Sequence, residues 1–234
     1  MKQISYMAFV IWTCIGFVLM FFWEVPDWLS FSNSIFLILF ALATVALYDW
    51  STRNILTALA IGLLTYTVEV IGVATGFPFG TYEYTDTLGF LVLGVPFTLG
   101  FAWIGVIYSS LFLSTSSNRV IRSLQIGFWV LVIDAILDPA AIELGFWGWE
   151  HSGAYYGIPL TNFIAWFVLA FIVSLMIPKQ TMNARDRRRG VWLFQLIVLF
   201  FGILTAREGV ISILIVTAVA VMLAEGWYRY DRSQ

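Results

Sequence analysis

Charged residues are scarce in this sequence. They make up 11% of its 234 residues, whereas an average soluble domain has roughly 25%. Hydrophobic residues account for 61%, and the mean hydropathy is +0.90. A composition this apolar excludes a soluble globular domain of this size. It also contains no basic stripe of the kind that binds nucleic acid, so we expect no nucleic-acid partner.

Cysteine and histidine are almost missing. Cys14 is the single cysteine and lies inside an apolar run, which excludes an intrachain disulfide and a thiolate metal site. His151 is the single histidine, and as a metal ligand it would lack partners. The sequence also has no Ser-His-Asp set, no glycine-rich phosphate loop and no haem motif. We therefore expect no metal and no cofactor.

Long apolar runs are what the sequence has instead. A helix needs about 20 apolar residues to cross a hydrocarbon layer roughly 30 Å thick. We therefore expect an all-α, polytopic transmembrane helical bundle that forms a single domain over residues 1–234. Eight segments qualify, at about 4–23, 31–48, 54–75, 90–114, 119–138, 160–178, 190–206 and 209–225. The alternative is seven helices with the last two segments joined, because only Arg207 and Glu208 separate them.

The distribution of basic residues predicts the orientation. With the N-terminus in the cytoplasm, 11 of the 12 lysines and arginines fall on the cytoplasmic side and only Arg207 falls outside, as the positive-inside rule requires. Eight helices then return the C-terminus to the cytoplasm. The aromatic residues after the first run do not resemble a signal-peptide cleavage site, so we expect a retained first helix in a multi-pass plasma-membrane protein. The basic run Arg185–Arg189 is typical of a topology signal and an anionic-lipid contact.

An internal repeat spans the centre of the chain, with units at about 54–114 and 119–178. The first copy runs from Glu69 through GFPFGTYEY to GVPFTLGFAW, which ends at Trp103. The second runs from Asp138 through GFWGW to GIPLTNFIAW, which ends at Trp166. Both copies start on helices of the same orientation, as in parallel-repeat folds. A pseudo-two-fold axis along the membrane normal would bring Glu69 and Asp138 towards each other.

Three acids lie within the predicted spans: Glu69, Asp134 and Asp138. An acid near the bilayer centre costs at least about 2.5 kcal/mol, so each is a candidate functional residue. Glu69 and Asp138 both lie 16 residues after an arginine of their span, about 24 Å above the inner boundary. Asp134 and Asp138 share one face of a helix. Two like charges so close in a low dielectric do not both ionise, which keeps one carboxylic acid as a proton donor. Pro139 is expected to end or kink this helix.

Aromatic residues gather in the two long outer loops, at about 76–89 and 139–159. An aromatic belt at the lipid headgroups explains any one of them equally well, but their clustering beside the acids favours a binding site. We expect Tyr82, Tyr84, Trp147 and Trp149 to line the mouth of a pocket, and Asn162 to hold a water molecule at the same level. The candidate substrate-binding residues are Tyr82, Tyr84, Trp147, Trp149, Tyr156, Asn162, Trp103 and Trp166.

The motifs around these acids resemble a known family. The chain is similar to the bacterial and archaeal carotenoid biosynthesis membrane proteins typified by carotenoid 1,2-hydratases. The similarity lies in Glu69 and in the motifs GFPFGTYEY, GVP, DAILDPA (Asp134 to Ala140), GFWGW and YYGIPLTN. The resemblance covers about Glu69 to Trp166. It implies an acyclic carotenoid substrate and addition of water across its terminal C1–C2 double bond. Membrane lipid is an expected partner, and other carotenoid biosynthesis enzymes are further candidates.

The residues suit that chemistry. A neutral carboxylic acid (Asp134, Asp138 or Glu69) protonates C2, aromatic faces stabilise the tertiary cation at C1, and a carboxylate takes up the proton that water releases. We expect the polyene to lie in an apolar tunnel between helices 3 to 6, open to lipid and ending at the three acids.

Three other readings remain open. A carotenoid end-group cyclase would begin with the same protonation but exclude water. A transporter would place its helix breaks at the bilayer midplane, whereas the Gly/Pro interruptions here lie at the outer surface. A carotenoid-binding protein without turnover would not need the costly buried acids. The pattern DxxxD also occurs in membrane prenyltransferases, but the second acidic motif that they need is missing.

Overall fold

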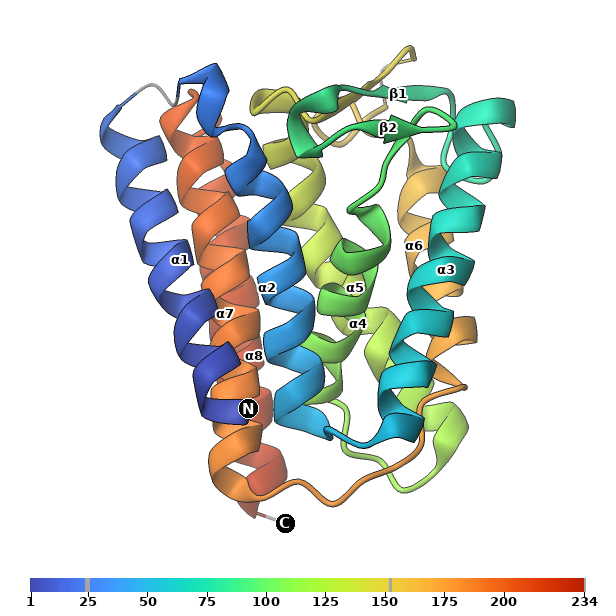
Figure 1. Cartoon of the computed structure of the whole chain (residues 1–234), viewed down its shortest axis with the longest axis vertical. Coiled ribbons are helices and arrows are strands. Elements are labelled where there is room, and N and C mark those ends of the chain that lie inside the picture. Colours follow the sequence, from blue (N-terminus) through green and yellow to red (C-terminus); the bar gives the residue numbers. More distant parts are fainter. Residues whose placement is uncertain (24–25, 152, 234) are drawn as a thin grey trace.

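The computed structural model describes residues 1–23, 26–151 and 153–233; Glu24, expected in an outer loop, lies outside these residues. The part described is a helical bundle with a small cap of strands at one end (Figure 1). Its eight helices are α1 (Lys2–Phe22), α2 (Phe31–Tyr48), α3 (Thr52–Thr75), α4 (Leu99–Leu111), α5 (Arg119–Glu143), α6 (Leu160–Ser174), α7 (Ala184–Arg207) and α8 (Ile213–Ser233). Short 3-10 helices span Asp27–Leu29 (η1) and Asp86–Leu88 (η2). The expected polytopic bundle is confirmed, with eight helices rather than seven in the described residues.

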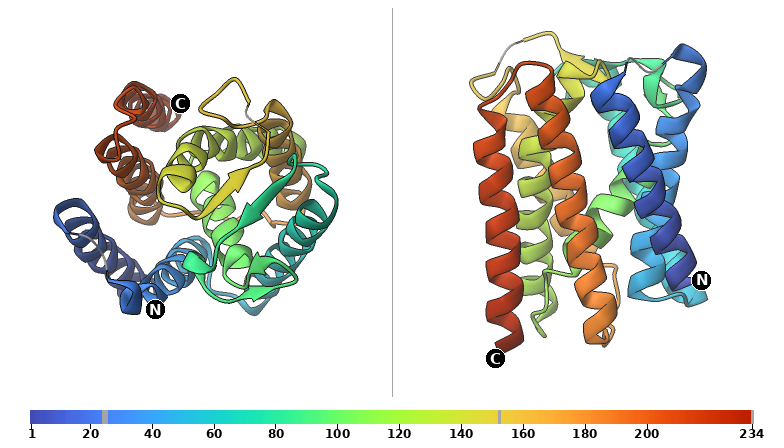
Figure 2. Two further views of the ribbon diagram at one scale, coloured as in Figure 1. Left: turned by 90° about the horizontal axis from the view of Figure 1, so that it is seen from above. Right: turned by 90° about the vertical axis from the view of Figure 1, so that its left-hand side faces the viewer.

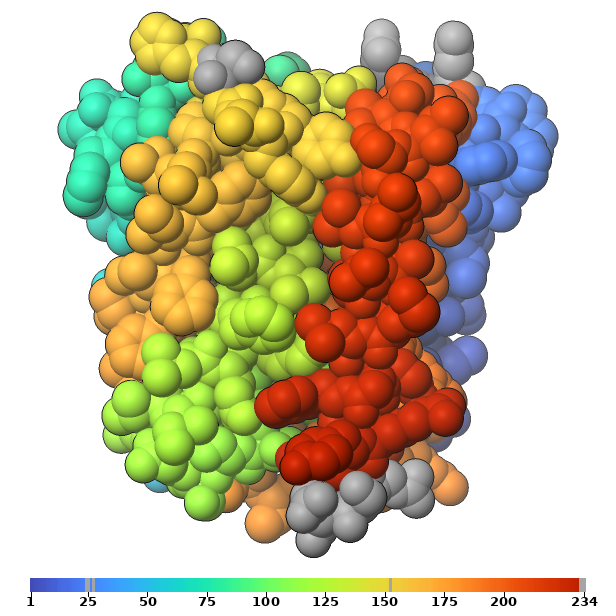
Figure 3. Space-filling view, turned by 180° about the vertical axis from the view of Figure 1, so that it is seen from behind, coloured from blue at the N-terminus to red at the C-terminus, as the bar shows by residue number. Residues whose placement is uncertain are grey.

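Six of these helices are long and apolar enough to cross a membrane, whereas α4 and α6 have only 13 and 15 residues. The outward faces carry large exposed apolar side chains, such as Phe128, Ile164 and Ile215. Figure 3 shows the face on which α5, α6 and α8 lie beside one another. Contiguous exposed apolar surface of this kind is unsuited to water but suits lipid.

The cap consists of four short strands: β1 (Tyr82–Tyr84), β2 (Leu91–Val92), β3 (Val95–Pro96) and β4 (Trp147–Trp149). β1 pairs antiparallel with β4, and β2 with β3. We call this the loop end of the bundle, and the opposite end, where α1 begins and α8 ends, the basic end (Figures 1 and 2). Seen from above, α4 occupies the middle of the bundle (Figure 2).

Several expected helix boundaries are wrong. α7 begins six residues before the expected position 190, and α8 ends at Ser233 rather than near 225. The span predicted from residue 90 begins only at Leu99, because Gly89 and Gly94 have positive φ angles and residues 91–96 form the β2–β3 hairpin. The span predicted to 178 ends at Ser174. The short α4 and α6 leave room at the loop end, which the strands fill.

Helix α5 passes through Pro139 instead of ending there. A proline in a helix removes the hydrogen bond to the carbonyl four residues earlier, which here belongs to Ala135. The hydroxyl of Tyr155 donates to that carbonyl at 2.8 Å. The freed acceptor is therefore satisfied by a side chain from the following loop, and α5 continues to Glu143.

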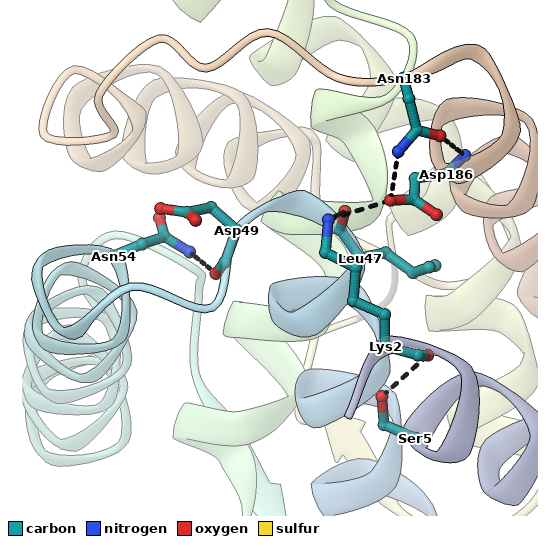
Figure 4. Close-up of polar contacts among 7 residues, drawn as sticks. All are labelled: Lys2, Ser5, Leu47, Asp49, Asn54, Asn183 and Asp186. Carbon is teal, nitrogen blue, oxygen red and sulfur yellow. Dashed lines mark hydrogen bonds and ion pairs between the residues drawn. The ribbon is translucent and has the colours of Figure 1, made fainter.

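Side-chain contacts join the helices at the basic end. Lys2 Nζ donates to Asp186 Oδ2 at 2.9 Å and to the carbonyl of Leu47 at 3.2 Å, which links α1, α7 and α2 (Figure 4). Asn183 caps α7 by accepting from the backbone N–H of Asp186 at 2.7 Å. Asn54 of α3 donates to the carbonyl of Asp49 at 2.9 Å. The hydrogen bonds of Lys2 connect α1, α2 and α7 at the basic end, although the bonded residues lie far apart in the sequence.

Candidate functional site

Glu69 lies on α3 with its carboxylate buried among three donors. Tyr82 and Tyr84 hydroxyls donate to Oε2 at 2.5 Å and 2.9 Å, and Trp103 Nε1 donates to Oε1 at 2.8 Å. Only 2% of Glu69 is exposed. Donors on both oxygens stabilise the charged form of a buried carboxylate. β1 supplies both tyrosines, because alternate residues of a strand point to the same side.

The hydroxyls of Tyr82 and Tyr84 remain protonated. Burial, followed by the charge of Glu69, raises the pKa of the Tyr82 hydroxyl well above its usual value. The same two causes act in the same order on the pKa of Tyr84. Both side chains are therefore hydrogen-bond donors throughout the physiological pH range.

Asp134 and Asp138 form the second half of the cluster, one helical turn apart on α5. Both are fully buried, and both meet the amide of Asn162 at the start of α6. Asn162 Nδ2 donates to Asp138 Oδ2 at 2.5 Å and lies 3.4 Å from Asp134 Oδ2. The buried Oδ1 of Asp134 has no hydrogen-bond partner among the described residues. Such an orphaned acceptor is costly and suits a water molecule or a protonated carboxyl group.

The two halves lie close together. Glu69 interacts electrostatically with both Asp134 and Asp138, so the three acids that the sequence singled out form one cluster. Trp147 supplies a further hydrogen bond to Asp138. No group of three or more His, Cys, Asp or Glu side chains suited to a metal ion occurs in the described part of the chain.

The repeat explains how the halves meet. In the β1–β4 pair, Tyr82 is opposite Trp149 and Tyr84 is opposite Trp147, so the two outer motifs lie side by side. Trp103 and Trp166, at matching positions of the two copies, stack with ring centroids 4.1 Å apart. Contacts between matching positions are what a pseudo-two-fold axis along the bundle produces.

The remaining aromatic candidates differ in position. Trp149 is half-buried, packs against Tyr82 and donates from Nε1 to the carbonyl of Phe79 at 3.1 Å. Tyr156 is not brought to the cluster, because its hydroxyl lies 2.8 Å from Ser212 Oγ at the start of the α8 segment. Its φ of 48° lies in the left-handed region.

Tyr155 is a residue that the sequence did not single out. Its hydroxyl donates a hydrogen bond to the carbonyl of Ala135 and interacts electrostatically with Asp134 and Asp138. Burial raises the pKa of this hydroxyl to about 12. The available signal was the proline inside an apolar helix, which requires a substitute donor for the carbonyl four residues before it.

An apolar cavity of about 660 Å³ adjoins the acid cluster. It lies between α1, α2, α4, α5, α6 and α7. Three of these, α4, α5 and α6, belong to the helices between which we expected a tunnel, whereas α3 contributes no residue to this cavity. The three acids do not line it. Its wall includes Trp147, which bonds to Asp138, and Trp166, which stacks on Trp103. Trp147 therefore contacts both the cavity and Asp138, and the stacked pair Trp166 and Trp103 connects the cavity with Glu69.

Comparisons with known proteins identify the family of the chain. A model of a family described as "Carotenoid biosynthesis protein" matches residues 32–226. A bisanhydrobacterioruberin hydratase of Haloarcula japonica is 30% identical over 141 residues, which are 57% of this chain and 48% of the relative. The chain thus spans about half the length of that curated relative. No solved structure matches the chain. Because the family model covers most of the chain, including all three acids, this protein belongs to the carotenoid biosynthesis protein family.

Proposed function

We propose that this protein is a carotenoid hydratase that adds water across the terminal C1–C2 double bond of an acyclic carotenoid. The observation that carries the proposal is the cluster of three buried acids next to a large apolar cavity. The similarity to bisanhydrobacterioruberin hydratase supports hydration as the reaction type, and the family supports a carotenoid as the substrate class.

Asp134 and Asp138 act as the proton donor. They share the amide of Asn162 and are both buried, so a second negative charge between them is unfavourable. One carboxyl group of the pair keeps its proton and transfers it to C2 of the substrate, while the pair titrates as a unit. The C1–C2 π electrons form the new C2–H bond, and C1 becomes a tertiary cation.

The aromatic layer stabilises that cation. Trp147 and Trp166 face the cavity, and each aromatic face contributes roughly 1–2 kcal/mol to binding a desolvated cation. Water then bonds to C1 through oxygen, and the resulting oxonium ion loses one proton to a carboxylate of the cluster. The donor pair is restored, so the net reaction is the addition of one water molecule.

We assign Glu69 the role of the anionic group, because three hydrogen-bond donors surround its carboxylate. Its three donors fix the negative charge in position, where it favours positive charge developing on the substrate. A preorganised charge of this kind is a large contribution to catalysis in a water-poor site. The apolar cavity holds the end of the polyene, which reaches the protein from the lipid of the plasma membrane.

The proposal is tested by expressing the chain in cells that make an acyclic carotenoid and analysing the pigments by mass spectrometry. We expect a product heavier by one water, and label from H₂¹⁸O in its hydroxyl group. A product of unchanged mass with a ring would indicate a cyclase, and label from ¹⁸O₂ would indicate an oxygenase. Asp138→Asn is the inactive control, and Glu143→Gln, an exposed acid on the same helix, is the matched active control.

A further inference from the structure

A second polar site lies at the basic end, far along the bundle from the acid cluster. It is a recess of about 200 Å³ between the ends of α4, α5 and α7 and the segment after α6. Three cationic side chains line it, Arg122, Lys179 and Arg187, but only one acid, Asp231. The remaining lining includes Tyr48, Ser114, Thr115 and Gln180.

Arg122 is the residue that makes this recess unusual. It is 3% exposed, yet no carboxylate pairs with it among the described residues. Its Nη2 donates to the carbonyl of Ile177 at 2.6 Å, and its buried Nε has no hydrogen-bond partner. A guanidinium has five N–H donors, so one neutral carbonyl leaves the charge largely uncompensated. Burial of an unpaired charge is costly unless another group neutralises it.

The acids nearby are already engaged. Asp231 pairs with Arg187 at 2.7 Å and accepts from Thr115 Oγ1 at 2.5 Å. Asp186 pairs with Lys2 (Figure 4). Asp49 accepts hydrogen bonds from the neutral side chains of Ser51 and Gln180, and it does not line the recess. Among the described residues, no carboxylate forms an ion pair with Arg122 or Lys179.

Two helix N-termini add to this charge. Arg122 lies in the first turn of α5 and Arg187 in the first turn of α7. The N-terminus of a helix carries a partial positive charge, which repels an arginine but attracts an anion. Phosphate groups commonly bind where arginine side chains and helix N-termini converge. Since a water molecule takes up about 30 Å³ in the liquid, the recess has room for a phosphate group and several waters.

We propose that this recess binds a phosphate group, with Arg122 and Lys179 as its principal ligands. Two sources share this chemistry: the headgroup of an anionic phospholipid, and free inorganic phosphate. The site is separate from the acid cluster, and its occupation neutralises a buried arginine. Binding therefore stabilises the basic end of the bundle.

The test measures thermal unfolding of the purified full chain in a neutral detergent. One arm adds phosphatidylglycerol, with phosphatidylcholine as its control; the other adds inorganic phosphate, with chloride at equal ionic strength. A saturating ligand should raise Tm by about 5 °C or more. A rise with phosphatidylglycerol alone assigns the site to lipid, and a rise with inorganic phosphate assigns it to the free ion.

Variants show whether the effect arises at this recess. Arg122→Gln and Lys179→Gln should each lose at least half of the rise, whereas Arg119→Gln, an exposed arginine three residues from Arg122, should keep it. If Arg122→Gln does not fold, the Tm rise of Lys179→Gln is compared with that of the wild type, because Lys179 is exposed. No rise with either probe, or equal rises in Lys179→Gln and the wild type, would overturn the proposal.

Discussion

Trp103 and Trp166 stack on each other at the centre of the bundle, with ring centroids 4.1 Å apart and planes inclined by 26°. Each lies seven residues after the proline of its repeat copy, yet their roles differ. Trp103 donates to Glu69 at 2.8 Å, whereas Trp166 lines the apolar cavity. The pair thus connects the charged half of the site with the space proposed for the substrate.

Replacing these two tryptophans separates the roles. Trp103→Phe removes a donor to a buried carboxylate, an interaction of roughly 1.5–3 kcal/mol, so we expect at least a tenfold loss of hydration rate. Trp166→Phe keeps an aromatic face at the cavity and should cost less. The measurement is product formed per amount of membrane-inserted protein. A greater loss in Trp166→Phe than in Trp103→Phe would contradict this division.

Asp134→Asn and Asp138→Asn should each lower product formation by about 100-fold or more, because an amide cannot supply the acid proton. Membrane insertion should be unchanged, since an uncharged side chain is less costly in the bilayer. Pigment analysis and quantitative immunoblotting of membranes measure the two quantities. Near-wild-type conversion in both variants would remove the pair from the mechanism.

Glu69→Gln and Tyr82→Phe test the charged half of the site. Glu69→Gln removes the charge and should lose most of the activity, and Tyr82→Phe should lose about tenfold, the cost of one hydrogen bond to a charged group. Tyr156→Phe is the matched control, because Tyr156 contacts Ser212 instead of the acids. If Tyr156→Phe were as damaging as Tyr82→Phe, the described position of Tyr156 would not be the functional one.

The contact of Tyr155 with Ala135 predicts coupling between Tyr155 and Pro139. Tyr155→Phe leaves a buried carbonyl unsatisfied, which costs about 1–3 kcal/mol, and should lower Tm by a few degrees. In a Pro139→Ala background the restored N–H of residue 139 satisfies that carbonyl, so the same change should cost little. Thermal unfolding of the two single variants and the double variant measures the coupling. Additive effects would show that Tyr155 does not substitute for the missing N–H.

The cavity predicts where a bulky side chain blocks the substrate. Ala102 on α4 lines the cavity, so Ala102→Trp should reduce conversion at least tenfold by filling that space. Leu59→Trp, on a lipid-exposed position of α3, is the control of equal size. Conversion of an acyclic carotenoid in membranes is the readout. Normal conversion by Ala102→Trp would instead favour the route among helices 3 to 6 that the sequence suggested.

Much of the fold and the acid cluster could be predicted from local patterns. Apolar length and the spread of basic residues indicated eight spans, because lipid imposes the same length on each helix. The helix period placed Asp134 and Asp138 on one face, and the repeat placed Glu69 at their level. Asn162 was expected at this level, at the start of the sixth helix, but as a residue that holds a water molecule; its contact with both aspartates was not predicted. Each of these inferences depended only on spacing along the chain.

The tertiary structure alone decided which side chains surround the acids and where the apolar cavity lies. The sequence could not show that Tyr155 bonds to Ala135, that Tyr156 contacts Ser212, or that the cavity lies against α1, α2 and α7. The sequence also could not show that Arg122, among the basic residues near it, would be buried without a paired carboxylate. These features depend on contacts between segments far apart in the chain. Packing of whole helices sets such contacts, and spacing within any one segment does not encode them.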